Sequence, residues 1–317
     1  MKPHTICIIG GTGFVGRHLA ARLAKDGHHL RILTRRREQH RELLVLPTAE
    51  LIECKVHDEE ALRQGINGAD VVINLVGILN ERGHNGKGFH RAHVELTEKV
   101  ISACKARKIK RLLHMSALGA DAENGPSFYQ RSKGQAERMV LESGLQATCF
   151  RPSVIFGHDD SFFNRFAGLL RTTPLAFPLA CAQARFAPVH VSDVVEAFTR
   201  AIDNPATHGQ SYALCGPKEY TLEQLVRYTA KQLGVSRWII ALPDWASRLQ
   251  ARLLEFAPGK PFSRDNYNSM KSPNVCDGPF PEVFGIQPSS IETVVPNYLA
   301  PRRGRATYNH YRRLARR

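Results

Sequence analysis

The N-terminal stretch of this chain joins a short apolar run to closely spaced glycines and then to a segment with helical periodicity. It reads Ile6-Cys7-Ile8-Ile9-Gly10-Gly11-Thr12-Gly13-Phe14-Val15-Gly16. The glycines match both GxxGxxG and GxGxxG, and a strand, a tight turn and a helix are the context in which such motifs bind nucleotides. The N–H groups at the start of the helix would hold the phosphates. The residues that we predict to contact a cofactor here are Gly10, Thr12, Gly13, Phe14, Val15 and Gly16. The alternative is a glycine-rich turn without a ligand.

The charge of the chain is strongly positive and unevenly distributed. The 317 residues carry a formal charge of +15, and 43% of them are hydrophobic, which is enough for a sizeable core. Seven arginines lie from Pro301 onward, where no acidic residue occurs. Such a segment attracts anionic lipid, acidic proteins or nucleic acid. Because no nucleic-acid-binding motif accompanies it, we favour an anionic membrane surface or an acidic protein partner, and consider nucleic acid unlikely.

The cysteines are dispersed and form no local pair. There are seven, several of them in apolar runs, and no CxxC spacing occurs. This pattern predicts reduced, buried cysteines in a cytosolic protein. No apolar run reaches the ~18 residues that span a bilayer, and the first strand begins too early for a signal peptide. We therefore predict a cytoplasmic location, with peripheral contact to the inner face of the membrane.

The segment after the first helix predicts which dinucleotide binds. Residues 29–34 read as a strand that ends in Arg35-Arg36-Arg37. An acidic residue usually grips the adenosine ribose at this place, whereas arginines such as Arg35 and Arg36 can bind a 2′-phosphate. We therefore favour NADP(H) over NAD(H), with a solvated basic turn as the alternative. Asp58 follows a third strand at residues 50–54 and would either approach the adenine or cap the next helix.

The following segments alternate between strands and helices. Residues 69–77 form a continuous apolar run, residues 93–107 have helical periodicity, and residues 109–115 read as another strand. Apolar runs of this kind belong to parallel strands that are covered on both faces. We predict an α/β fold with a doubly wound parallel sheet of the Rossmann type. The end of the 69–77 strand would pass the cofactor at Leu75, Val76 and Gly77.

Three regions follow from this pattern. We place the dinucleotide-binding core at residues 1–157. Residues 158–300 form a mixed part that returns strands and helices to the core and builds a smaller lobe for substrate or docking, and residues 301–317 form the basic tail.

A tyrosine and a lysine lie four residues apart in the next predicted helix. Ser127 is a candidate cap, and Tyr129 and Lys133 share one helical face. A phenol has a pKa near 10, so it is a poor acid–base at neutral pH. A neighbouring ammonium lowers that pKa, and the same lysine can bind the nicotinamide ribose. Both residues are therefore predicted for catalysis and for cofactor binding.

Together, these residues resemble the short-chain dehydrogenase/reductase superfamily, in its extended or atypical NAD-dependent epimerase/dehydratase branch. The resemblance covers most of residues 4–235. Residues 162–166 and Cys276-Asp277-Gly278-Pro279-Phe280 look like the group related to the NDUFA9 subunit of respiratory complex I. This resemblance implies a bound NADPH that is held more firmly than a turnover substrate. Pro152 and Val154, in the Arg151–Gly157 segment, would shape the nicotinamide pocket.

Two positions depart from the catalytic pattern of that superfamily. Catalytic members place a Ser or Thr at the end of the fifth strand, often the second of two serines. Here Ser116 is followed by Ala117. Either Ser116 contacts the substrate carbonyl, or the catalytic hydroxyl is missing. His93 stands where extended members often carry an Asn, which puts the proton relay in doubt.

The C-terminal part leaves further alternatives open. Residues 162–171 would pack in a core or line a substrate cavity. Residues 245–256 are amphipathic and would either pack on the lobe, which we favour, or lie on a membrane or a partner. His190 and Asp193 lack further metal ligands nearby, so we predict no metal.

The function that these observations favour is NADP(H)-dependent oxidoreduction of a carbonyl, quinone or lipid-like substrate. Tyr129 would be the acid–base, Lys133 its partner and Ser116 a carbonyl ligand. The alternative is a non-catalytic module that holds NADPH within a membrane-associated complex.

Overall fold

A seven-stranded parallel sheet forms the centre of the computed structural model, which describes residues 2–300. The strand order is β11-β6-β5-β4-β1-β2-β3. The strands are β1 (Thr5–Ile9), β2 (His29–Thr34), β3 (Ala49–Glu53), β4 (Val71–Asn74), β5 (Arg111–Met115), β6 (Gln146–Pro152) and β11 (Gln210–Leu214). The order reverses beside β1, so the carboxyl ends of β1 and β4 open the crevice in which such sheets bind ligands. The predicted doubly wound α/β fold is confirmed.

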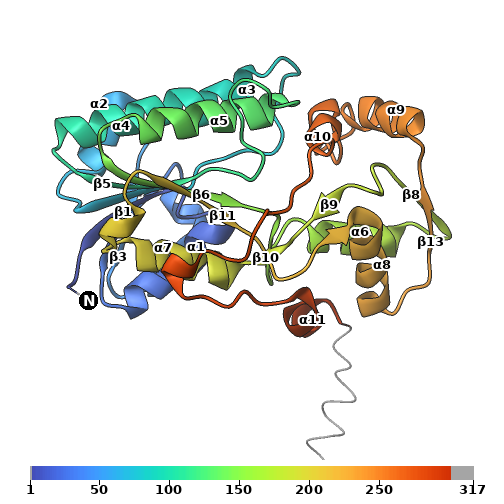
Figure 1. Cartoon of the computed structure of the whole chain (residues 1–317). Coiled ribbons are helices and arrows are strands. Elements are labelled where there is room, and N and C mark those ends of the chain that lie inside the picture. Colours follow the sequence, from blue (N-terminus) through green and yellow to red (C-terminus); the bar gives the residue numbers. More distant parts are fainter. Residues whose placement is uncertain (1, 301–317) are drawn as a thin grey trace, which may run out of the picture.

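Helices cover both faces of this sheet (Figure 1). One layer contains α2 (Glu59–Gly65), α4 (Leu96–Ala106) and α5 (Phe128–Leu141), and the other contains α1 (Phe14–Lys25) and α7 (Val191–Ala201). Each layer closes its own core, the first around Leu96 and Val100 and the second around Leu19 and Phe198. Because both faces are covered, the inner strands read as continuous apolar runs rather than alternating ones.

Two predicted elements have different bounds in the structure. The strand expected at residues 69–77 ends at Asn74, whose side chain accepts a hydrogen bond from the N–H of Val76 and so turns the chain out of the sheet. The helix expected from residue 93 begins earlier, with α3 (Lys87–Phe89) and a π-helical segment (His90–Glu95) that continues into α4.

A smaller lobe lies beside the carboxyl ends of the strands (Figure 1). Its helices are α6 (Phe163–Thr172), α8 (Leu222–Leu233), α9 (Asp244–Leu254), α10 (Arg264–Ser269), α11 (Ile291–Val294) and α12 (Pro296–Leu299). Its strand pairs are β8 (Ala176–Leu179) with β13 (Trp238–Ala241), β9 (Arg185–Phe186) with β12 (Tyr220–Thr221), and β7 (Ile155–Phe156) with β10 (Val189–His190). Single 3-10 turns occur at Arg37–Gln39, Arg41–Val45, Pro205–Thr207 and Glu282–Phe284.

The lobe has a core of its own. Phe163 and Leu170 of α6 are fully buried in it, together with Leu225 of α8. The core-packing interpretation of residues 162–171 is therefore confirmed for these side chains. No helix among residues 2–300 is both long and apolar enough to cross a membrane. The basic tail falls outside the described residues.

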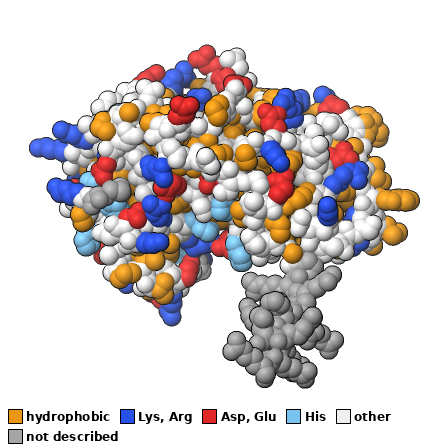
Figure 2. Space-filling view, turned by 60° about the horizontal axis from the view of Figure 1, so that its bottom comes forward, with side chains coloured by type: hydrophobic (Ala, Val, Ile, Leu, Met, Phe, Trp, Pro, Cys, Tyr) orange, Lys and Arg blue, Asp and Glu red, His pale blue; other side chains and the backbone are white. Residues whose placement is uncertain are grey.

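Helix α9 packs against the lobe with small residues and exposes its large ones. Ser247 and Ala251 are buried, whereas Trp245, Leu249 and Leu253 are exposed. The helix therefore packs on the lobe, as favoured, but the expectation that its large apolar stripe packs inward was wrong. Hydrophobic side chains are also seen at the lobe end of the molecule, on the right of Figure 2.

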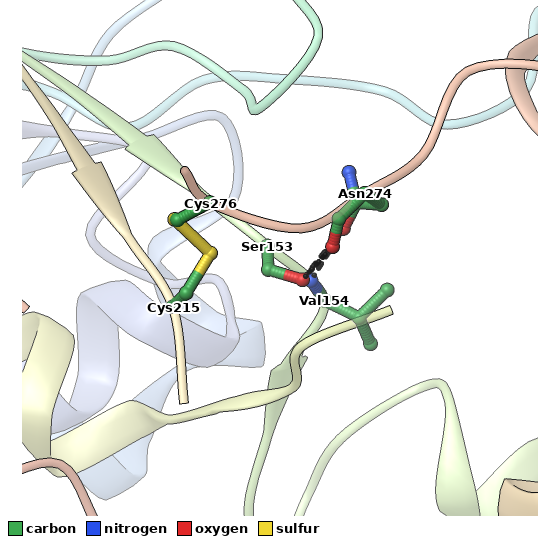
Figure 3. The surroundings of a disulfide bond; sticks show 5 residues. All are labelled: Ser153, Val154, Cys215, Asn274 and Cys276. Carbon is green, nitrogen blue, oxygen red and sulfur yellow. Dashed lines mark hydrogen bonds between the residues drawn. A yellow bond between two sulfur atoms is a disulfide. The ribbon is translucent and has the colours of Figure 1, made fainter. Parts of the chain in front are cut away.

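A disulfide joins two cysteines that the sequence places 61 residues apart, Cys215 and Cys276. Cys215 directly follows β11, and Cys276 lies in the segment that returns from α10 to the core (Figure 3). The other five cysteines are free, and four of them are buried. The prediction of a wholly reduced set was wrong for this pair, because only the tertiary fold brings the two thiols together.

Candidate functional site

The glycine stretch forms a tight turn between β1 and α1. Gly10 adopts a left-handed conformation (φ +82°), and Gly13 is the N-cap of α1 without any side-chain cap. A Cβ on Gly16 would lie 2.5 Å from Gly11 Cα and 2.6 Å from Gly10 O. The helix therefore approaches the turn as closely as glycine permits, and no side chain caps its first N–H groups. This arrangement fits the pyrophosphate of a dinucleotide.

Adding one methyl group at Gly16 should disturb the tight turn between β1 and α1. We expect Gly16→Ala to lower the free energy of unfolding by about 1–3 kcal/mol, because the new methyl overlaps backbone that cannot rotate away. We also expect it to weaken dinucleotide binding. Gly168→Ala in α6 is the matched control, since a Cβ there meets nothing within 4 Å. Urea denaturation and cofactor titration measure both effects. An equal loss of stability in the two variants would contradict the proposed close packing.

A basic groove of about 800 Å³ lies at the carboxyl ends of β2, β3 and β4. Arg35 and Asp58 line it, while Arg36 does not. The Asp58 side chain accepts a hydrogen bond from Ala61 N (3.0 Å), so the predicted helix cap is confirmed and contact with adenine stays a prediction. Further cations that line the groove, which the sequence analysis missed, are Lys55, Arg82 and Arg91.

The segment after β4 brings its backbone next to the predicted catalytic helix. Leu75 N bonds to Ile9 O (2.9 Å), which keeps the segment beside the glycine turn. A Cβ on Gly77 would lie 3.1 Å from Lys133 Nζ and 3.7 Å from His93 Nε2. The predicted residues Leu75, Val76 and Gly77 therefore lie between the glycine turn and the lysine.

Helix α5 carries Tyr129 and Lys133 at this edge of the sheet. Its N-cap is Ser127, which accepts a hydrogen bond from Gln130 N (3.0 Å), as predicted. Lys133 is only 3% exposed, and its Nζ donates to the carbonyls of Met115 (2.9 Å) and Val76 (3.4 Å). Burial lowers the pKa of this ammonium to about 8.

The pKa of the Tyr129 phenol is raised in the structure, whereas the sequence predicted that it would be lowered. Burial raises its pKa to about 12, so it is protonated at neutral pH. The expected lowering by Lys133 is absent in this structure, because the ammonium is directed at backbone carbonyls. The ring packs edge-on against Phe89 and His93, with centroid distances of 6.1 and 5.6 Å.

His93 is a neutral, fully bonded group beneath the tyrosine. Its Nε2 accepts from Ile78 N (3.1 Å), and its Nδ1 lies 2.8 Å from Ser132 Oγ, which itself donates to Tyr129 O. These partners leave the proton on Nδ1. Burial, followed by the charge of Lys133, lowers the pKa of His93 to about 2. With both nitrogens engaged, His93 holds the loop after β4 rather than passing protons to Tyr129.

The buried histidines should make the protein sensitive to acid. His114, which is also buried, has its pKa lowered to about 3, so both rings are neutral when folded and take up protons only on unfolding below pH 6.5. Stability is therefore full above pH 6.5 and should fall by about 1.4 kcal/mol per pH unit for each histidine as the pH drops. Denaturation curves at pH 7 and pH 5 measure this slope.

His93→Asn should reduce the slope by about 1.4 kcal/mol per pH unit, and His29→Asn, at an exposed position, should leave it unchanged. A His93→Asn variant with the parental slope would show that other groups cause the acid sensitivity.

Ser116 takes part in a buried polar network behind the lysine. Its hydroxyl donates to Glu137, which also accepts from Arg151 Nε (2.8 and 2.9 Å) and from Ser211. The hydroxyl of Ser116 is thus engaged with α5, one helical turn beyond Lys133, and the next residue, Ala117, is buried. Contact between Ser116 and a substrate carbonyl stays a prediction.

The loop after β6 is fixed by a segment from near the C-terminus. Asn274 Oδ1 accepts from Ser153 Oγ (2.6 Å) and from Val154 N (3.1 Å), two residues before the disulfide (Figure 3). Pro152 ends β6 and accepts from Leu118 N (3.1 Å). Asn274 was missed by sequence reasoning, because no local signal marks a residue that acts 120 positions away.

A second cavity, of about 170 Å³, lies between the loop after β4 and the lobe. Asp265 of α10 lines it and accepts from the N–H groups of Phe128 (2.7 Å) and Tyr129 (3.2 Å), which caps α5 from outside. Lys260 Nζ bonds to the carbonyls of residues 81, 82 and 83. The lobe therefore holds both α5, which carries Tyr129 and Lys133, and the loop beside it.

This geometry defines a dinucleotide-binding α/β protein with the tyrosine–lysine pair of the short-chain dehydrogenase/reductase superfamily. The family model described as the NAD dependent epimerase/dehydratase family matches residues 6–215. Because this match covers more than half of the chain, the protein belongs to that family.

Individual proteins show the same relationship. Mitochondrial NADH dehydrogenase (ubiquinone) 1 alpha subcomplex subunit 9 of Rattus norvegicus is 29% identical over 295 residues, which are 90% of this chain and 77% of the relative. The ceramide reductase of Caulobacter vibrioides is 29% identical over 242 residues, which are 75% of this chain and 74% of the relative. The crystal structure of gox2253 has a TM-score of 0.72 at 21% identity, covers 93% and 96% of the two chains, and supports the fold alone. The resemblance to the NDUFA9-like group is thus confirmed, and the site fits a nicotinamide dinucleotide.

Proposed function

We propose that this protein is an NADP(H)-dependent oxidoreductase that reduces a carbonyl or quinone of a lipid-like substrate. The observation that carries the proposal is the Tyr129–Lys133 pair at the carboxyl edge of the sheet, next to a glycine turn shaped for a pyrophosphate. When bound, the reduced nicotinamide supplies the hydride for the carbonyl carbon. The chain itself supplies the proton and positions the reactants.

The protonation state of Tyr129 suits the reducing direction of the proposed reaction. Tyr129 is a neutral phenol at pH 7, so it can donate a proton to the substrate oxygen as that oxygen becomes an alcohol. Lys133, with a pKa of about 8, is an ammonium at that pH and donates to the carbonyls of Met115 and Val76, which lie beside the crevice. His93 fixes the neighbouring loop and has no free proton for this step.

Two observations support the lipid-like substrate class. A relative is named a ceramide reductase, which is an enzyme of lipid chemistry. Phe89 and Phe128 line the cavity beside α5, although its other lining groups are polar. Both features support an amphipathic carbonyl compound rather than a purely apolar one.

The function is tested with the purified full-length chain. NADPH or NADH is added, and oxidation is followed by the absorbance of the reduced nicotinamide with a long-chain ketone or a short-tailed ubiquinone. We expect tight binding of NADPH and slow, substrate-dependent oxidation. Firm binding of NADPH that no such compound oxidises would overturn the enzymatic proposal.

That outcome would favour a second function, a module that holds NADPH within a membrane-associated complex. The engagement of Ser116 with Glu137 supports it, because the usual hydroxyl beside the tyrosine is then unavailable to a substrate. A relative is named as a subunit of NADH dehydrogenase.

The arginines after β2 should select the cofactor. We expect a double Arg35→Glu and Arg36→Glu variant to weaken NADPH binding by about 10- to 100-fold and to leave NADH binding nearly unchanged, because charge-assisted bonds to a 2′-phosphate are lost. Lys25→Glu, exposed at the far end of α1, reverses a charge away from the groove and serves as control. Equal weakening of both dinucleotides would argue against a 2′-phosphate site.

A further inference from the structure

Both tryptophans of the chain lie exposed on the lobe, one in β13 and one in α9. Trp238 is 79% exposed and Trp245 is 70% exposed. We define the lobe face by its exposed large apolar residues: Leu175, Trp238, Ile240, Trp245, Leu249, Leu253 and Phe256. Exposed apolar surface of this extent on a soluble domain marks an interaction site.

Backbone geometry turns these side chains outward. In β13, Ile239 is buried while Trp238 and Ile240 on either side of it point to solvent. In α9, Trp245, Leu249 and Leu253 repeat every four residues on one side. The opposite side of α9 presents Ser247 and Ala251 to the lobe, so the helix is seated by its small residues. This arrangement keeps the large side chains available for a partner.

The exposed charges around the lobe face are mainly positive. Arg171 and Arg252 are exposed and have no ion-pair partner among residues 2–300. Arg237 precedes Trp238 in the chain, whereas the charge of Arg248 on α9 is balanced by Asp244. The acidic residues of the same segment are already engaged: Asp244 pairs with Arg248 and bonds to Tyr267, and Glu255 is buried against Arg264 and His84. Figure 2 shows Lys and Arg side chains among the hydrophobic ones at this end of the molecule.

We propose that the lobe face binds the surface of an anionic phospholipid membrane, with α9 lying in the plane of the interface. Tryptophan suits the boundary between headgroups and acyl chains, since its ring is apolar and its N–H is polar. Positively charged arginines around an apolar row attract the phosphates of anionic lipids. A second copy of this chain would instead bring like charges together, which disfavours self-association through this face.

The lobe face ends close to the candidate active site. Phe256 packs against His84 with ring centroids 5.4 Å apart, and His84 and Glu255 line the cavity beside α5. If the proposed reductase function holds, a carbonyl substrate could reach that cavity from the membrane surface. Membrane binding itself does not depend on that function.

Intrinsic tryptophan fluorescence reports on this face alone, because the chain has no other tryptophan. The full-length protein is titrated with vesicles of phosphatidylglycerol and phosphatidylcholine, and with vesicles of phosphatidylcholine only. We expect a blue shift with the anionic vesicles, and quenching when their acyl chains are brominated. We expect at least ten-fold weaker binding to the neutral vesicles.

Two variants locate the contact while both tryptophans are retained. Leu249→Ser with Leu253→Ser should weaken binding about ten-fold or more. Val45→Ser, at a 78% exposed position of the dinucleotide-binding core, should change nothing. Unchanged dinucleotide binding in each variant shows that the fold is intact.

Three outcomes would overturn the proposal. Vesicle binding without a tryptophan shift would place the contact elsewhere, for instance in the basic tail. A shift that depends on protein concentration without lipid would indicate a second copy as the occupant. Equal binding of the double variant and the parent would exclude the lobe face.

Discussion

Replacing Tyr129 with Phe should lower the rate of substrate-dependent NADPH oxidation by about 10²- to 10⁴-fold, the usual contribution of a positioned general acid. The substitution removes one hydroxyl and keeps the ring that packs against Phe89 and His93. Affinity for NADPH should change little, because the phenol is protonated and uncharged before the reaction. Steady-state rates and a cofactor titration on the same preparation measure the two quantities.

Tyr212→Phe is the matched control for this substitution. Tyr212 lies in β11 and its hydroxyl makes one long bond, to Ala206 O (3.3 Å), away from the crevice. Its loss should leave the rate unchanged. A Tyr129→Phe variant that turns over at the parental rate would remove Tyr129 from the mechanism and leave it as a packing residue.

Loss of the Cys215–Cys276 disulfide should destabilise the protein by about 4 kcal/mol, because the bond closes a loop of 61 residues in the unfolded chain. The bond also fastens the segment that carries Asn274, which holds the loop after β6. We therefore expect dinucleotide or substrate binding to weaken along with stability. Urea denaturation with and without a dithiol reductant measures the change.

A Cys215→Ser and Cys276→Ser double variant should behave like the reduced parent and should no longer respond to reductant. Cys181→Ser alters a free, partly exposed cysteine and should retain the response. Alkylation of the unfolded, unreduced chain should count five free thiols. Seven modified thiols, or equal stability with and without reductant, would show that the bond does not form in solution.

Local sequence patterns predicted the parts of the site that lie next to one another in the chain. The glycine turn, the cap at Asp58 and the cap at Ser127 each involve residues three to six positions apart, so spacing was sufficient to find them. The pairing of Tyr129 with Lys133 on one helical face follows from the helical repeat in the same way. The direction of the Lys133 ammonium does not follow from the helical repeat, because its partners are carbonyls on β5 and after β4.

Two expectations from residue type were wrong, one about the pKa of Tyr129 and one about the side of α9 that packs inward. An isolated lysine near a phenol favours the phenolate, but burial raises the pKa of Tyr129 instead. An amphipathic stripe usually packs inward, but α9 is seated by Ser247 and Ala251 and exposes its large side chains. In both cases the surroundings come from segments far away in the sequence.

The sequence by itself determined the doubly wound sheet, the phosphate-binding turn and the helix that carries the tyrosine and lysine, because each depends on periodicity or spacing within a few turns of chain. The tertiary structure alone decided the disulfide, the engagement of Ser116 with Glu137, the clamps made by Asn274 and Asp265, and the exposure of the lobe face. These features join residues that are 21 to 137 positions apart or depend on which side of an element is covered. Contacts of that kind arise only when the sheet, its helices and the lobe are packed together.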